Sequence, residues 1–185
     1  MLSLLRNPVN ELAKANRSHS YARTLSILIV SSVLFAIGGF LMTSAVLPTS
    51  TAFAYFSATG LFFMTIIASI ILSVVVVLIA NTISGKQQTY YHGITSVSYS
   101  IFPGSIGFLI MGLSVNVPFG LFIGIVLAAI FVSLGLSIFF KSLKEFFRLD
   151  SASALSLLLI AVVAFAVSFF SSTAFLGIVN ALLQL

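Results

Sequence analysis

The sequence predicts an all-α integral membrane protein, a bundle of five transmembrane helices with a cytoplasmic N-terminus and an external C-terminus. The first observation is composition: 60% of the 185 residues are hydrophobic and 6% are charged. A soluble domain carries about 25% charged residues, so this chain lacks the polar surface that water requires. The second and third observations concern the few charges, which leave long stretches uncharged and lie on one side of a five-span arrangement.

Three stretches without any charged residue, 24–85, 87–140 and 151–185, define the spans. A helix needs about 20 apolar residues to cross the hydrocarbon core, so these stretches accommodate two, two and one spans. Pro48 divides the first stretch, and the turn around Pro118 divides the second. The predicted spans are residues 25–47, 52–80, 94–113, 119–140 and 153–175. They form one transmembrane domain over residues 25–185, which follows a cytoplasmic segment over residues 1–24.

The positions of the basic residues predict the topology. All eight precede the first span or lie in the second-to-third and fourth-to-fifth connections. Because cytoplasmic segments are enriched in Lys and Arg, a five-span arrangement with the N-terminus inside satisfies this rule, whereas four or six spans do not. We expect a multi-pass protein of the plasma membrane, or of an endomembrane if the source is eukaryotic. Besides Arg6, the predicted cytoplasmic interface consists of Lys14, Arg17, Arg23, Lys86, Lys141, Lys144 and Arg148.

The predicted spans contain no ionisable residue, which argues against several classes of activity. Proton relays, carboxylate-coupled transporters and histidine-ligated haem all need such groups inside the membrane. His19 and His92 lie in predicted cytoplasmic segments without a partner at metal-ligand spacing, and the chain has no cysteine. We therefore expect no catalytic residues, no cofactor, no metal and no nucleic-acid partner.

Two polar segments at the predicted cytoplasmic face each have two interpretations. Asn7 and Pro8 predict the start of a short helix, with Leu12 on its apolar face. This helix is either an interfacial amphipathic helix with basic residues near anionic headgroups, or a basic anchor before the first span. In the connection over 87–92, Tyr90 and Tyr91 form either an interfacial aromatic belt, which we favour, or a recognition surface.

Pro103 lies inside the third predicted span, where a proline removes a backbone hydrogen bond and kinks a helix. The carbonyl of Tyr99 should lose its usual partner, while Gly104 and Gly107 allow close approach to another helix. The kink is either a static packing feature, which we favour, or a hinge or substrate contact.

Small residues at four-residue spacing predict helix-packing faces, because they let backbones approach closely within lipid. In the fourth span this face contains a G-x-x-x-G pattern. The sequence leaves open whether these faces meet within one chain or between chains. The predicted packing residues are Gly120, Gly124 and Ala128 in the fourth span and Ala164 and Ser168, followed by Ser172, in the fifth.

The order of these features resembles the Yip family, the Ypt/Rab-interacting proteins and their prokaryotic relatives. The resemblance implies five spans, a cytoplasmic N-terminus, no catalytic residues and a role in membrane organisation. The Asp-Leu-Tyr-Gly-Pro motif of eukaryotic members is absent, which favours the prokaryotic branch. Three stretches carry the resemblance: Asn7-Pro8, then Tyr99-Ser100-Ile101-Phe102-Pro103, and the connection from Gly135-Leu136 to Ala152 and Ala154 that contains Leu143, Lys144 and Arg148.

The leading hypothesis for function is a non-enzymatic membrane protein of the Yip type that organises the bilayer or scaffolds partners. The alternative is a transporter or permease, or an accessory subunit of a larger complex, that handles a neutral or lipid-like solute. Uncharged polar residues of the spans, such as Ser69 and Ser73, would line its path. Expected partners are the lipid bilayer together with further copies of the chain or other membrane proteins.

Overall fold

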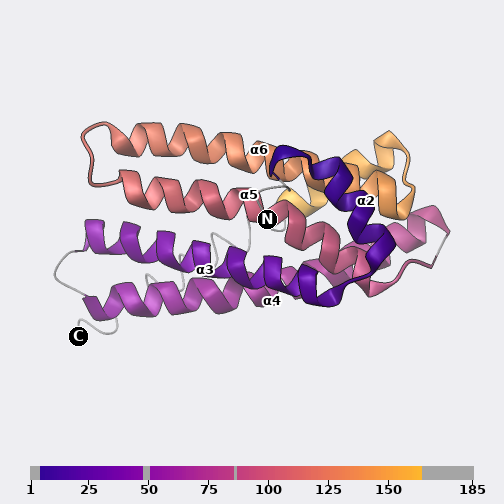
Figure 1. The fold of residues 1–185 in the computed structure, drawn as a ribbon, viewed down its shortest axis with the longest axis horizontal. Coiled ribbons are helices and arrows are strands. Elements are labelled where there is room, and N and C mark those ends of the chain that lie inside the picture. The colour runs from indigo at the N-terminus through magenta and orange to yellow at the C-terminus, as the bar shows by residue number, and fades with distance from the viewer. Residues whose placement is uncertain (1–4, 48–50, 86, 164–185) are drawn as a thin grey trace.

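The computed structural model describes residues 5–47, 51–85 and 87–163, and this part of the chain is helical throughout apart from its connections (Figure 1). Four of its helices are long and apolar enough to cross a membrane, and a shorter apolar helix, Ser151–Val163, follows them. The four long helices are α3 (Tyr21–Val46), α4 (Thr51–Ser84), α5 (Tyr90–Ser114) and α6 (Gly120–Phe147), and the short helix α2 (Pro8–Ser18) precedes them.

Each of the first four predicted spans coincides with a helix, but all four helices extend further than predicted at one end of the bundle. α3 and α5 begin four residues earlier than expected, α4 ends four residues later, at Ser84, and α6 continues from Phe140 to Phe147. The expectation that 141–150 form a basic connection was therefore wrong for its first part. Ser142 and Phe146, with Leu143 and Phe147, repeat every four residues and are buried, so the helix continues to bury this face. Of the predicted fifth span, residues 164–175 lie outside the described part.

The bundle is organised around α5, which packs against α3, α4 and α6 (Figure 1). More than half of the most apolar stretch of α5 is buried, compared with a third or less of the corresponding stretch in the other three long helices. Its sequence is also the least apolar of the four. A central position explains this difference, because helices α3, α4 and α6 shield α5 from lipid.

Glycines on α5 allow the close crossings that this central position requires. A Cβ atom on Gly107 would lie 2.9 Å from the Cα atom of Ala128 on α6, and one on Gly93 would lie 2.6 Å from the carbonyl oxygen of Ser73 on α4. A Cβ on Gly112 would lie 2.7 Å from a backbone carbonyl on α3. Within lipid, where helices gain little hydrophobic energy by pairing, such backbone contacts supply much of the association energy.

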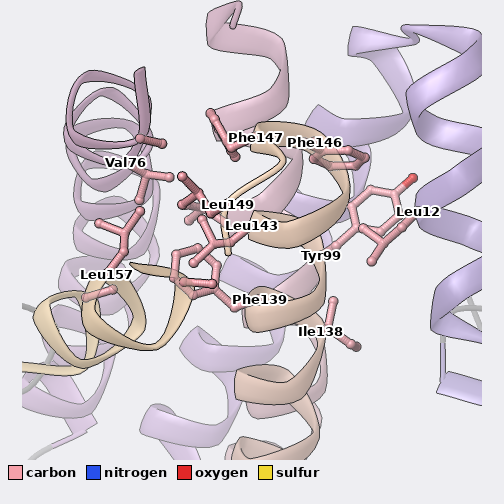
Figure 2. Packing of buried hydrophobic residues seen from close by; sticks show 14 of the residues in the cluster. Leu12, Val76, Tyr99, Ile138, Phe139, Leu143, Phe146, Phe147, Leu149 and Leu157 are labelled. Atoms are coloured by element: carbon pink, nitrogen blue, oxygen red, sulfur yellow. The ribbon is translucent and has the colours of Figure 1, made fainter. Parts of the chain in front are cut away.

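The hydrophobic core is concentrated where α2 and the last helix meet the ends of the long helices (Figure 2). Leu12 of α2 and Leu157 of the last helix are each 1% exposed. Between them lie large side chains from the part of α6 that continues beyond Phe140. The labelled members of this cluster in Figure 2 are Leu12, Val76, Tyr99, Ile138, Phe139, Leu143, Phe146, Phe147, Leu149 and Leu157.

The outward faces of α3, α4 and α6 are apolar and exposed over much of their length. Ile71 and Leu78 on α4 are 58% and 62% exposed, and Phe122 and Ile130 on α6 are 70% and 59% exposed. A continuous apolar surface of this kind is compatible with hydrocarbon and incompatible with water.

Candidate functional site

The described basic residues gather at one end of the bundle, which we call the basic end. It comprises α2, the first turn of α3 and the last two turns of α6, which lie together in Figure 1. These three elements carry Arg6, Lys14, Arg17, Arg23, Lys141, Lys144 and Arg148, or lie directly beside them, while Lys86 falls outside the described residues. Alternating helix directions bring these distant segments together.

α2 is a capped amphipathic helix whose apolar face packs against the protein. The Asn7 side chain accepts a hydrogen bond from the backbone N–H of Asn10 at 3.3 Å, and the helix ends at His19 in the left-handed conformation. Leu12 and Ala15 are each 1% exposed. Because the bundle already buries this face, α2 does not insert these two side chains into lipid as the interfacial-helix interpretation requires.

Glu11 ties α2 to α3 through a buried ion pair. Its carboxylate is paired with the Arg23 guanidinium and accepts a hydrogen bond from the Lys14 ammonium at 3.2 Å. Burial raises the pKa of Glu11, but the Lys14 hydrogen bond and the Arg23 charge more than offset this effect and leave the pKa below its ordinary value. The ionised carboxylate is therefore the form that the docked helix favours.

Tyr91 and His92, in the first turn of α5, bind the other side of α2. The Tyr91 hydroxyl donates to the Ala15 carbonyl at 3.0 Å, and the His92 Nε2 atom lies 3.2 Å from Asn16 Oδ1. Thr89 Oγ1 lies 3.1 Å from His92 Nδ1. Since an amide oxygen can only accept, Nε2 carries the proton and Nδ1 accepts from the Thr89 hydroxyl.

The expected aromatic belt is thus wrong for Tyr91, which is 2% exposed, and holds at most for Tyr90, which is 38% exposed. The belt was inferred from residue type alone, since tyrosine is common at the membrane interface. Tyr91 is buried because its hydroxyl donates to a backbone carbonyl on α2, that of Ala15, 76 residues earlier in the chain. No local pattern in the sequence carries that information.

Aromatic rings complete the contact between α2 and the bundle. His19 lies 5.0 Å from Tyr91 and 5.4 Å from His92, measured between ring centroids, and Tyr21 lies 4.9 Å from Tyr91. His92 also contacts Phe146 of α6 at 5.4 Å. Among the described residues, no three His, Cys, Asp or Glu side chains form a group suited to a metal ion. The ring contacts form a junction of α2, α3, α5 and α6.

Tyr99 has a role that the sequence did not indicate. Its ring is buried below α2 in the same cluster as Leu12, with the side chain directed toward that helix (Figure 2). Within the described residues, its hydroxyl and that of Ser98 have no hydrogen-bond partner. The residue that we selected for its backbone carbonyl thus contributes its side chain to the α2 junction.

Pro103 is an interior, buried residue of α5, and the ribbon changes direction near the middle of this helix (Figure 1). Serine hydroxyls on both sides donate to carbonyls of the same helix, from Ser100 to Val97 at 2.8 Å and from Ser105 to Phe102 at 2.7 Å. Of the neighbouring glycines, Gly107 makes the close backbone contact with α6, whereas a Cβ on Gly104 would have Val132 as its nearest neighbour at 3.8 Å.

The small residues of α6 face α5 of the same chain. A Cβ on Gly124 would lie 3.0 Å from the Cα atom of Met111 and would collide with the Ser114 side chain. Ala128 lies against Gly107, and Gly120 lies against the turn at Ser114. These contacts use the G-x-x-x-G face within the monomer. Ala164, Ser168 and Ser172 lie outside the described residues.

Comparison with known proteins places the chain in a family. The model of the Yip1 domain matches residues 2–173. No curated protein and no solved structure matches the chain. The match covers α2, all four long helices and the helix that follows them. The chain therefore belongs to the Yip1 domain family and is a multi-pass membrane protein.

Proposed function

We propose that this protein is a non-enzymatic organiser of the membrane that scaffolds partner proteins. Yip1-domain proteins are generally non-enzymatic membrane proteins, which supports this class. The observation that carries the proposal is the separation of two surfaces. The described charged side chains lie at the basic end, and the long helices present apolar outer faces on α3, α4 and α6. Such faces suit lateral contacts with lipid and with other transmembrane helices.

In this proposal the basic end lies in the cytoplasm and the protein resides in the plasma membrane of a prokaryote. The positive-inside rule supports the orientation, because the described Lys and Arg residues lie together at that end. α2 then forms a cytoplasmic cap over the ends of α5 and α6.

The alternative, a transporter for a neutral solute, has less support. Such a path needs polar groups that are free to contact the solute. Four buried serines of the spans donate instead to carbonyls four residues earlier in their own helices, whereas the Ser98 hydroxyl has no partner among the described residues. These hydrogen bonds are Ser31 to Ile27, Ser32 to Leu28, Ser69 to Thr65 and Ser73 to Ser69.

Site-specific photo-cross-linking in native membranes tests the proposal. A photoreactive amino acid would replace Ile71 on α4 or Phe122 on α6, both exposed, and Leu12, which is buried, as the control. We expect discrete protein adducts from at least one exposed position and none from the buried one. Cross-links to lipid alone from both exposed positions would contradict scaffolding. Solute uptake by proteoliposomes that contain only this protein would support the transporter instead.

A further inference from the structure

A basic stripe occupies the outer side of the last two turns of α6. Lys141 and Lys144 follow the three-residue spacing that aligns side chains on one helix face, Arg148 is the C-cap residue directly after the helix, and all three are exposed. Glu145 is also exposed in this segment, whereas the opposite side of the same turns is buried in the core. This part of α6 is therefore packed on one side and positively charged on the other.

The length of α6 places this stripe at headgroup depth. Its uncharged part, residues 120–140, is about 31 Å long, which matches a hydrocarbon core of about 30 Å. Lys141 follows directly, Lys144 lies about 6 Å beyond the hydrocarbon edge and Arg148 about 12 Å beyond it. Since each headgroup layer is about 5–8 Å thick, the backbone of the two lysines lies within it and that of Arg148 lies beyond it.

The Lys144 side chain contacts two neutral groups. The Lys144 ammonium lies 5.8 Å from the centre of the Phe140 ring, at the predicted edge of the hydrocarbon. It also donates to the Ser151 hydroxyl at 3.0 Å, a neutral partner. These contacts orient the side chain without neutralising it.

The acids at this end are largely directed elsewhere. Glu11 is buried and paired with Arg23 and Lys14. The Asp150 carboxylate accepts hydrogen bonds from the backbone N–H groups of Ala152, at 3.0 Å, and Ser153, at 3.3 Å, at the start of the last helix. Glu145 is then the acid that shares the segment with the basic stripe, and the stripe keeps a net positive charge.

We propose that Lys141 and Lys144, assisted by Arg148, bind the phosphate groups of anionic phospholipids in the leaflet at the basic end. The inference deepens the proposed membrane-organising function, because it gives the protein a preferred lipid environment. A basic residue near an anionic membrane surface contributes about a five-fold preference. Two lysines at headgroup depth therefore provide selection between anionic and zwitterionic lipids.

Electron paramagnetic resonance of spin-labelled lipids tests this selection. The full chain, in phosphatidylcholine vesicles, would be compared for its association with labelled phosphatidylglycerol and labelled phosphatidylcholine. We expect the unaltered protein to prefer the anionic lipid several-fold, and K141Q/K144Q to lose most of that preference. R148Q should lose less, because the backbone of this residue lies beyond the headgroup layer.

Matched variants separate charge from folding. K141R/K144R keeps the charge and should keep the preference, while E145Q removes the negative charge of this segment and should increase it. Equal association of both lipids with the unaltered protein, or an unchanged preference in K141Q/K144Q, would overturn the inference. Protein adducts in the cross-linking experiment would still support scaffolding in that case, so the two proposals can fail separately.

Discussion

The Tyr91 hydroxyl on α5 donates a hydrogen bond to the Ala15 carbonyl on α2, and the same carbonyl accepts the backbone N–H of His19 at 3.1 Å. One oxygen thus both ends α2 and joins it to the central helix of the bundle. Together with the Glu11–Arg23 ion pair, this contact makes α2 a docked part of the transmembrane domain.

Tyr91→Phe should weaken the docking of α2 by about 1 kcal/mol, since it removes one buried hydrogen bond but leaves Ala15 its second donor. Trypsin cleavage after Lys14 or Arg17 should accelerate about five-fold in native-like detergent. Tyr90→Phe is the control, because Tyr90 is exposed, and it should leave cleavage unchanged. Equal rates for both variants would show that the hydroxyl does not hold α2.

Acid should release α2 through Glu11. Because its pKa is lowered in the folded protein, its stabilising contribution is complete above the ordinary glutamate value of about 4.3 and is lost as the pH falls below it. The chain has no cysteine, so a single cysteine at the exposed Asn10 allows specific spin labelling. The label should become mobile as the pH falls from about 5 to 3.

Glu11→Gln provides the control for this titration. The variant should already show a more mobile label at neutral pH, with little further change in acid. A pH response that persists in this variant would assign the effect to another group, such as Asp150.

Gly107→Ala should destabilise the bundle, because its Cβ would lie 2.9 Å from both the Ala128 Cα and the Phe131 Cβ on α6. We expect a loss of about 1–3 kcal/mol, as for other overpacked sites. Gly104→Ala is the matched control in the same helix, with 3.8 Å to its nearest neighbour, and should be neutral or stabilising. Thermal unfolding in detergent would compare them, and a reversed order would exclude this crossing as a tight contact.

Pro103→Ala should lower the thermal stability even though alanine is the better helix former. The direction of α5 on the two sides of Pro103 places Gly107 against α6 and Gly112 against α3, and a straighter helix would disturb one of these contacts. Pro118→Ala, in the exposed turn before α6, is the control. If Pro103→Ala keeps the stability but loses partner cross-linking, the bend acts as a hinge and the static interpretation is wrong.

The topology predicts that reporters fused after Gly85 and after Asp150 are cytoplasmic and that a reporter fused after Leu185 is external. This prediction rests on the position of the described basic residues, which lie together at one end of the bundle. A cytoplasmic reporter after Leu185 would contradict the five-span arrangement.

Segment-level features of this protein follow from the sequence alone. Four long helices, the start of α2 at Asn7-Pro8 and the confinement of basic residues to the ends of the spans are each determined by residues close together in the chain. Hydropathy, capping and charge act over one or two turns, so their pattern can be read in the printed sequence.

Which helix faces are buried, and against which element, was decided by the tertiary structure. The polar segment at Tyr91 and His92 reads as a loop at the membrane surface, yet it is buried by a helix 76 residues away. The basic segment after Phe140 reads as a connection, yet α6 continues because α2 and the last helix cover its apolar side. A glycine pattern in the sequence predicts that a helix face packs closely, but it does not show which helix it packs against. Such outcomes depend on the arrangement of distant segments in space, which no local pattern of residues encodes.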